Sequence, residues 1–206
     1  MEQKLKEISE LCGGKVATKF VVADFDNMYT IQDYHDALVE PLKDLDIGML
    51  ILNAGWAQMG PFEMLTEEEI QRHVTINILH VIYTAKVLTS QILERVSRTG
   101  KKVGMVITSS GLGLYPMAGA LAYSCGKGFD DFIARGLHVE FAGKVDVISY
   151  NAGMVNTPFI RDEDTKTQMQ GMMITPDEAA ASCFRDLGLS DNTKGAFKHS
   201  VGDLFP

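Results

Sequence analysis

Residues 102–153 form a predicted strand–helix–strand unit, KVGMVITSSGLGLYPMAGALAYSCGKGFDDFIARGLHVEFAGKVDVISYNAG. Its two ends, 102–110 and 144–153, are mainly apolar and rich in β-branched residues, which is typical of strands buried on both faces of a parallel sheet. The segment between them is predicted to be mostly helical over 117–143. Two parallel strands joined by a helix are the repeating unit of α/β folds.

The same alternation continues on both sides of this unit. Further strands are predicted at 15–25 (KVATKFVVADF), 47–53 (IGMLILN) and 195–202 (GAFKHSVG), and further helices at 31–45, 66–97 and 175–188. Thr66, before three acidic residues, and Thr175, before Pro176, are typical helix caps. We therefore predict an α/β fold with a doubly wound parallel sheet (Rossmann-like), as a single domain over residues 1–206.

Composition narrows the class of protein. The 206-residue chain is 46 % hydrophobic, which suits one globular domain with its own core. Its net charge of -8 argues against nucleic acid as the main partner, because phosphate backbones attract clustered Lys and Arg. No apolar run reaches the roughly 18 residues of a membrane span, and the charged N-terminus differs from a signal peptide, so a cytoplasmic location is expected. The 3 cysteines and 5 histidines lack metal-ligand spacing, so no metal site is predicted.

Polar, glycine-bearing turns follow three of the predicted strands. They are NAG at 53–55, SSG at 109–111 and NAGMVNTP at 151–158. Each turn alone needs no function, since Asn and Gly form turns in any protein. Because ligands of open α/β sheets bind beyond the carboxyl ends of the strands, three such turns on one rim indicate a ligand site there.

A tyrosine and a lysine lie one helical turn apart, at Tyr123 and Lys127. They share a helix face, and a nearby cation favours the phenolate form of a phenol whose free pKa is about 10. Small neighbours, Gly126 and Gly128, would let a substrate and cofactor approach closely. The plain alternative is a buried tyrosine and a surface lysine. Ser110, at the end of a predicted strand, and Asn77, a polar residue on an apolar helix face, favour the functional interpretation.

Five motifs together resemble the short-chain dehydrogenase/reductase family in order and spacing. They are LNAG (52–55), INILH (76–80), ITSSG (107–111), YSCGK (123–127) and AGMVNTP (152–158). The resemblance covers essentially the whole chain. Within the family, the chain looks most like hydroxysteroid dehydrogenases and very-long-chain 3-oxoacyl-CoA reductases.

The resemblance implies a catalytic set of four residues, Asn77, Ser110, Tyr123 and Lys127. Tyr123 would donate a proton to a ketone oxygen during reduction, or accept one from an alcohol during oxidation. Ser110 would hydrogen-bond the same oxygen. Lys127 would lower the pKa of the phenol and hold the nicotinamide ribose, and Asn77 would anchor a water that relays protons to Lys127.

The resemblance also implies a cofactor, NADP or NAD, as hydride carrier. The implied cofactor-binding residues are Asn53, Ala54 and Gly55 on the adenosine side, Asp24 near the adenine, Tyr123 and Lys127 at the ribose, and Val155 and Thr157 at the carboxamide. It implies a small-molecule ketone or alcohol substrate and a homo-oligomer formed through the helices at about 66–97 and 117–142. Related reductases carry a membrane anchor upstream, which would place such a protein at a membrane instead of free in the cytoplasm.

One family element is missing from the sequence. The family begins with a strand and a glycine-rich turn, T-G-x-x-x-G-I-G, that opens a helix, whereas Gly13 and Gly14 precede a predicted strand. The chain therefore looks N-terminally truncated by one βαβ unit. In the family strand order 3-2-1-4-5-6-7, the segments 15–25 and 47–53 would be the third and fourth strands, separated by the missing pair. We expect a fragment; the alternative is that these two strands pair directly. A smaller departure is Ala152–Gly153, where the family usually has Pro-Gly.

Two functions remain open from the sequence. The first is an oxidoreductase that interconverts an alcohol and a ketone, with Tyr123 as acid and base. The second is a catalytically silent assembly or binding subunit that lacks the cofactor phosphate loop. The segment 159–174 falls where the family has its substrate lid, and its methionines, Met169, Met172 and Met173, could contact a lipid-like ketone or simply fill a core.

Overall fold

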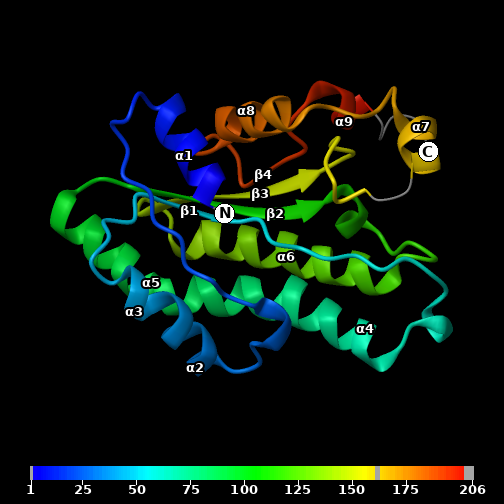
Figure 1. Ribbon diagram of the computed structural model, residues 1–206, viewed down its shortest axis with the longest axis horizontal. Coiled ribbons are helices and arrows are strands. Elements are labelled where there is room, and N and C mark those ends of the chain that lie inside the picture. Colours follow the sequence, from blue (N-terminus) through cyan, green and yellow to red (C-terminus); the bar gives the residue numbers. More distant parts are fainter. Residues whose placement is uncertain (1, 161–162, 202–206) are drawn as a thin grey trace.

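Four parallel strands form the sheet at the centre of the computed structural model, which describes residues 2–160 and 163–201 (Figure 1). The strands are β1 (Met49–Leu52), β2 (Val103–Ser110), β3 (Val145–Ala152) and β4 (Asn192–Thr193), and they lie side by side in this order. Helices cover both faces of the sheet (Figure 1). The predicted α/β class with a Rossmann-like parallel sheet is confirmed.

Alternate residues of β2 point to opposite faces of the sheet. Ile107 packs in one apolar core with Leu88 of α5 (His80–Thr99), and α6 (Leu121–Glu140) lies beside α5 on this face (Figure 1). Val106 packs in a second core with Cys183 of α8 (Pro176–Asp186) on the other face. Apolar burial on both faces explains why these strands are apolar throughout instead of alternating.

The longest helical run covers one face of the sheet. It consists of α4 (Glu67–Arg72), the π-helical segment η4 (His73–Leu79) and α5. It begins at a capping box in which the Thr66 hydroxyl accepts from the Glu69 amide at 3.1 Å, and it ends at Gly100, whose φ of 67° closes the helix. By length and mean hydropathy of 1.2 alone the run Glu67–Thr99 could cross a membrane, but it is also the helix that packs on the sheet.

Shorter helices complete the fold. They are α1 (Glu2–Leu11), η1 (Phe25–Asn27), α2 (Ile31–Tyr34), the π-helical η2 (His35–Val39), α3 (Glu40–Leu42), η3 (Phe62–Met64), η5 (Gly111–Leu114), α7 (Glu163–Met169) and α9 (Phe197–Val201). The predicted helix at 31–45 corresponds to the continuous run of α2, η2 and α3.

The register brings the carboxyl ends of the strands to one edge. Leu52 of β1 pairs with Ile107 of β2, and Ser109 pairs with Asn151 of β3. The three polar turns that follow these strands therefore leave the sheet at the same rim, as the sequence predicted.

The predicted strand at 15–25 is wrong. Residues 15–24 carry no helix or strand and connect α1, on the α8 side of the sheet, to η1 and α2 on the opposite side (Figure 1). Val22 is 80 % exposed. A segment with a strand-like pattern but no neighbouring strand has no partner for its backbone hydrogen bonds, so it does not become part of the sheet. Direct pairing of 15–25 with 47–53 is therefore wrong too: β1 pairs only with β2 among the described strands.

The predicted strand at 195–202 is also wrong over its described residues. The last strand, β4, lies just before it, and Phe197–Val201 form helix α9. Gly195 has a φ of 73°, which turns the chain away from β3 before a longer strand can form. Residue 202 lies outside the described residues.

Candidate active site

The strand-end serine and the predicted catalytic tyrosine lie together at the carboxyl edge of the sheet. Ser110 ends β2, and Tyr123 lies in the first turn of α6; both side chains are 8 % exposed. Burial raises the pKa of Tyr123 above its ordinary value, and a hydrogen bond with Ser110 opposes that rise. The two hydroxyls that the sequence placed at one site are thus close enough to interact.

Lys127 points into the protein and does not lower the pKa of the phenol. Its Nζ donates to the Thr108 carbonyl at 2.7 Å and to Asp130 Oδ2 at 2.9 Å. Lys127 is 3 % exposed and Asp130 is fully buried. The pKa of Tyr123 is raised overall, and the charge of Asp130 contributes to that rise. The expected lowering by Lys127 is therefore absent in this structure.

Asn77 fixes the loop that follows β1. Its Oδ1 accepts from the Trp56 amide and its Nδ2 donates to the Trp56 carbonyl, both at 2.9 Å. It lies in the π-helical segment η4, and such segments occur frequently at functional sites. These two hydrogen bonds to the loop explain why Asn77 is a polar residue on an apolar helix face. That Asn77 also anchors a water stays a prediction.

The loop after β1 meets α6 at Gly55. A Cβ added at Gly55 would lie 3.5 Å from Lys127 Nζ and 3.6 Å from Asn77 Oδ1. Its neighbour Ala54 is half-buried, and Asn53 accepts a hydrogen bond from the Thr108 hydroxyl at 3.0 Å. The NAG turn therefore lies against the predicted catalytic residues.

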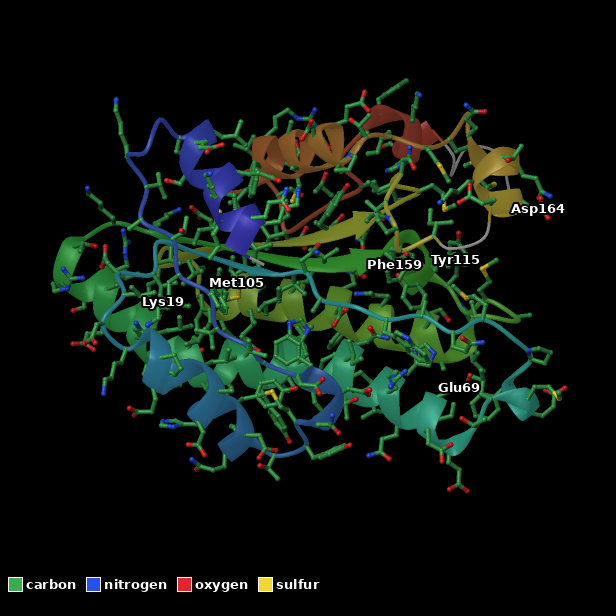
Figure 2. All side chains as sticks on the ribbon, viewed as in Figure 1. Lys19, Glu69, Met105, Tyr115, Phe159 and Asp164 are labelled. Carbon is green, nitrogen blue, oxygen red and sulfur yellow. The ribbon has the colours of Figure 1, made fainter. Side chains whose placement is uncertain are left out.

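The segment after β3 reaches the phenol through a residue outside the predicted set. Val155 bridges to Ile174, and the Thr157 hydroxyl accepts from the Phe159 amide at 3.4 Å. The rings of Phe159 and Tyr123 lie 6.3 Å apart. Figure 2 shows Phe159 beyond the carboxyl ends of β2 and β3.

Asp24 lies apart from these contacts. Its carboxylate caps η1, accepting from the Asp26 amide at 3.3 Å and from Asn27 Nδ2 at 2.7 Å. The structure gives it no contact with the other predicted cofactor-binding residues, and its place near an adenine stays a prediction.

The glycines around Lys127 allow close helix packing, and their role in substrate approach stays a prediction. A Cβ at Gly126 would lie 3.1 Å from Asn77 Cβ. A Cβ at Gly113 of η5 would lie 2.6 Å from the Lys127 carbonyl carbon, and one at Gly128 would lie 3.1 Å from the Gly113 oxygen. Small residues are needed here because η4 and η5 pack directly on the backbone of α6.

Three residues of the site were missed from the sequence. Asp130 pairs with Lys127, Thr108 accepts from Lys127, and the Ser109 hydroxyl donates to the Lys127 carbonyl at 2.6 Å. Asp130 follows Tyr123 by two helical turns and Lys127 by one, so helical spacing puts all three on one face. That spacing was the signal available in the sequence.

The family assignment comes from comparison with known proteins. Residues 1–168 match the family model of the short chain dehydrogenases. The chain belongs to the short-chain dehydrogenase family.

Within residues 2–160 and 163–201, no group of three or more His, Cys, Asp or Glu side chains could hold a metal ion.

Some relatives of this chain are named as reductases, and others are named as inactive. The chain is 27 % identical over 206 residues to the very-long-chain 3-oxoacyl-CoA reductase of Anas platyrhynchos, covering 97 % of this chain and 61 % of the relative. It is 28 % identical over 209 residues to the inactive hydroxysteroid dehydrogenase-like protein 1 of Homo sapiens, covering 99 % of this chain and 61 % of the relative. The chain thus spans less than two thirds of the length of these relatives.

Solved structures show the same fold. A 7beta-hydroxysteroid dehydrogenase superposes with a TM-score of 0.77 at 22 % identity, covering 97 % of this chain and 75 % of that one. A short-chain dehydrogenase from Sphingobium yanoikuyae, solved with NADPH, superposes with a TM-score of 0.74 at 22 % identity, covering 90 % and 69 %. At this identity the comparison supports the Rossmann-like fold.

Gly113→Ala should destabilise the folded chain and Gly136→Ala should not. The new methyl group at Gly113 would overlap the backbone of α6, and such overpacking typically costs about 1–3 kcal/mol. Gly136 lies in α6 itself and has open space around it, so alanine there should stabilise the protein by up to about 1 kcal/mol. Urea unfolding of both variants tests this. Equal stabilities would contradict the close packing of η5 on α6.

His80 should make the folded chain less stable in mild acid. Burial and the charge of Lys127 lower the pKa of His80 from 6.5 to about 4. Since the unfolded chain takes up this proton at higher pH than the folded one, stability falls between pH 6.5 and 4, by about 3 kcal/mol. Urea unfolding at several pH values should show a smaller loss for His80→Phe. The exposed His35→Gln variant is the control, and an equal loss in all three proteins would contradict the assignment.

Proposed function

We propose that the chain is the catalytic part of an NAD(P)-dependent oxidoreductase that interconverts an alcohol and a ketone. The observation that carries the proposal is the placement of the Ser110 and Tyr123 hydroxyls together, nearly buried, at the carboxyl edge of a Rossmann-like sheet. This edge is where ligands of such sheets bind.

Tyr123 acts as the acid in the direction of reduction. A phenol is protonated at neutral pH, and the pKa of Tyr123 lies above its ordinary value, so this phenol can donate to a ketone oxygen. Ser110 lies beside it and can hydrogen-bond the same oxygen as negative charge develops there. In the direction of oxidation the same two hydroxyls would remove the alcohol proton.

The described residues fit the nicotinamide half of the cofactor. Two of the three N–H donors of Lys127 are used by Thr108 and Asp130, and the third would meet a ribose hydroxyl. Val155 and Thr157 would hold the carboxamide, and Gly55 leaves room beside Lys127 for the adjoining sugar. The bound cofactor would supply or accept the hydride.

The T-G-x-x-x-G-I-G loop that would bind the diphosphate half is absent from residues 2–160 and 163–201, where the glycines after β2 form the short 3₁₀ helix η5 instead. Helix α1 precedes the first strand instead. Asn53, Ala54 and Asp24 would contribute on the adenosine side.

We propose that the substrate is a lipid-like ketone. We also propose that the protein is a homo-oligomer and that it is located in the cytoplasm or at a membrane. Phe159 is 48 % exposed above Tyr123, and Met172 is 46 % exposed in the following segment, so both present apolar surface near the site. Met169 and Met173 are partly buried. Related proteins are named for 3-oxoacyl-CoA and hydroxysteroid substrates.

A second candidate function is a silent assembly subunit. One relative is named inactive, and the described residues lack the phosphate loop. Phe132 and Val139 of α6 are 81 % and 73 % exposed, which is apolar surface that a second subunit could cover.

Cofactor titration distinguishes the two functions. We would titrate the 206-residue chain, and the chain extended by the sequence encoded upstream, with NADPH and NADH while following protein fluorescence. Saturable binding that is weakened by Lys127→Met supports the oxidoreductase. Absence of binding to both proteins would favour the silent subunit.

A further inference from the structure

Lys127 and Asp130 form a buried ion pair on the helix that carries the proposed catalytic tyrosine. Asp130 Oδ2 lies 2.9 Å from Lys127 Nζ, and the two side chains are 0 % and 4 % exposed. Asp130 Oδ1 is also buried and has no hydrogen-bond partner among the described residues. A buried carboxylate with one oxygen unpaired is costly, so the remaining contact with Lys127 is its main compensation.

The position of Asp130 lets it act on the catalytic pair. Tyr123, Lys127 and Asp130 lie on one face of α6, at successive helical turns. The other ionisable groups near them are His80 on α5, which senses the Lys127 charge, and His73 on η4, whose Nδ1 lies 3.2 Å from Asn77 Nδ2. Burial keeps His80 neutral at pH 7. Asp130 is therefore the negative charge closest to the ammonium on this face.

Two contacts hold the ammonium in place. Lys127 Nζ is bound at once by the Thr108 carbonyl of β2 and by Asp130. The Ser109 hydroxyl binds the Lys127 carbonyl, so the backbone of α6 is fixed at the same residue. The lysine is thus oriented toward β2 and Asp130, while its charge is partly neutralised.

We propose that Asp130 is a positioning residue that holds the Lys127 ammonium against β2 and offsets its charge, so that the ammonium stabilises the Tyr123 phenolate less. This inference rests on the proposed function and deepens it. A protonated phenol donates to a ketone oxygen directly, whereas alcohol oxidation needs the phenolate. Asp130 therefore shifts alcohol oxidation to higher pH, where the phenolate forms.

The neighbouring carboxylate supplies a matched control. Asp131 faces β3 instead, where it accepts from the Ser149 hydroxyl at 2.7 Å and from Asn151 Nδ2 at 3.0 Å. It is also buried, at 8 % exposed, and it makes no contact with Lys127 among the described residues. Asp130→Asn and Asp131→Asn are therefore the same substitution at adjacent buried positions. The first affects the ion pair with Lys127, and the second affects an ion pair with Arg135, at 3.6 Å.

The test is a titration of the Tyr123 phenol in the 206-residue chain without cofactor. Isotope-labelled tyrosine is followed by NMR across alkaline pH, and the Tyr123 signal is assigned by its loss in Tyr123→Phe. Asp130→Asn should lower the titration midpoint of Tyr123 by about one pH unit, since it removes a like charge and frees the ammonium. Asp131→Asn should leave the midpoint unchanged. An unchanged midpoint in Asp130→Asn, or an equal shift in both variants, would overturn the proposal.

A second variant and a second measurement keep the proposal testable if Asp130→Asn does not fold. If Asp130→Asn does not fold, Asp130→Ser replaces it, because the smaller side chain leaves room for a water beside Lys127. In an active preparation, the pH profile of alcohol oxidation should move to lower pH by the same amount as the phenol. A phenol shift in a chain with no activity at any pH would support the role of Asp130 and contradict the proposed function, so the two failures are distinguishable.

Discussion

Tyr123→Phe should lower the rate of ketone reduction by roughly 10²–10⁴-fold, the usual contribution of a positioned acid or base. The substitution removes the hydroxyl that lies beside Ser110 and keeps the ring that packs near Phe159. The fold and the affinity for cofactor should therefore change little. The measurement is the turnover number from nicotinamide absorbance, together with a cofactor titration of the same preparation.

Tyr115→Phe is the control for this loss. Tyr115 directly follows η5 and is 55 % exposed, and Figure 2 shows it at the same end of the sheet as Phe159. Its hydroxyl has no place in the proposed chemistry, so activity should stay within about twofold of the wild type, a change worth less than 1 kcal/mol. Full activity in Tyr123→Phe would remove Tyr123 from the mechanism.

Lys127→Met should destabilise the folded chain by about 3–5 kcal/mol, the usual result of removing one partner of a buried ion pair. The charge of Asp130 would then be buried with neither oxygen paired among the described residues. Urea unfolding at pH 7.5 measures the loss. With Lys127 in place the pKa of Asp130 is raised to about 6 by burial, and removing Lys127 raises it further because the ammonium lowers it. The loss of stability should therefore grow as the pH rises above 6.

The double variant Lys127→Met, Asp130→Leu tests the cause of that loss. Replacing both members of a buried ion pair by apolar residues of similar volume is often neutral or stabilising. We therefore expect the double variant to recover most of the stability lost in Lys127→Met. A further loss in the double variant would show that Lys127 stabilises the fold through contacts other than Asp130.

The core of the fold could be predicted because its signals are local. The strands β1, β2 and β3 are apolar runs, and the helices α4 and α8 begin at caps, Thr66 and Thr175, that can be recognised within a few residues. The segment 15–25 shows the limit of such signals. Its apolar, β-branched pattern is that of a strand, but a strand also needs a hydrogen-bonding neighbour, and that depends on the rest of the sheet.

The residues of the site could be found from spacing, but their charges could not. Helical spacing and strand ends predicted that Ser110, Tyr123 and Lys127 lie together. In the structure, Ser110 interacts with Tyr123, and Lys127 donates to Thr108, two residues before Ser110. In a sequence, Asp130 and Asp131 look like one pair of surface acids. Only the packing of α6 on β2 and β3 shows that both are buried and that they serve different partners. The Lys127 charge is consequently directed to Asp130 and not to the phenol.

The most direct test of the account is a turnover assay with a defined product. Purified protein, extended by the sequence encoded upstream, is mixed with NADPH or NADH and with 3-oxoacyl thioester or steroid ketone substrates. The account predicts that nicotinamide oxidation is matched by an equal amount of secondary alcohol, and that both disappear in Tyr123→Phe. Tight cofactor binding without alcohol formation from any of these ketones, or alcohol formation that persists in Tyr123→Phe, would contradict it.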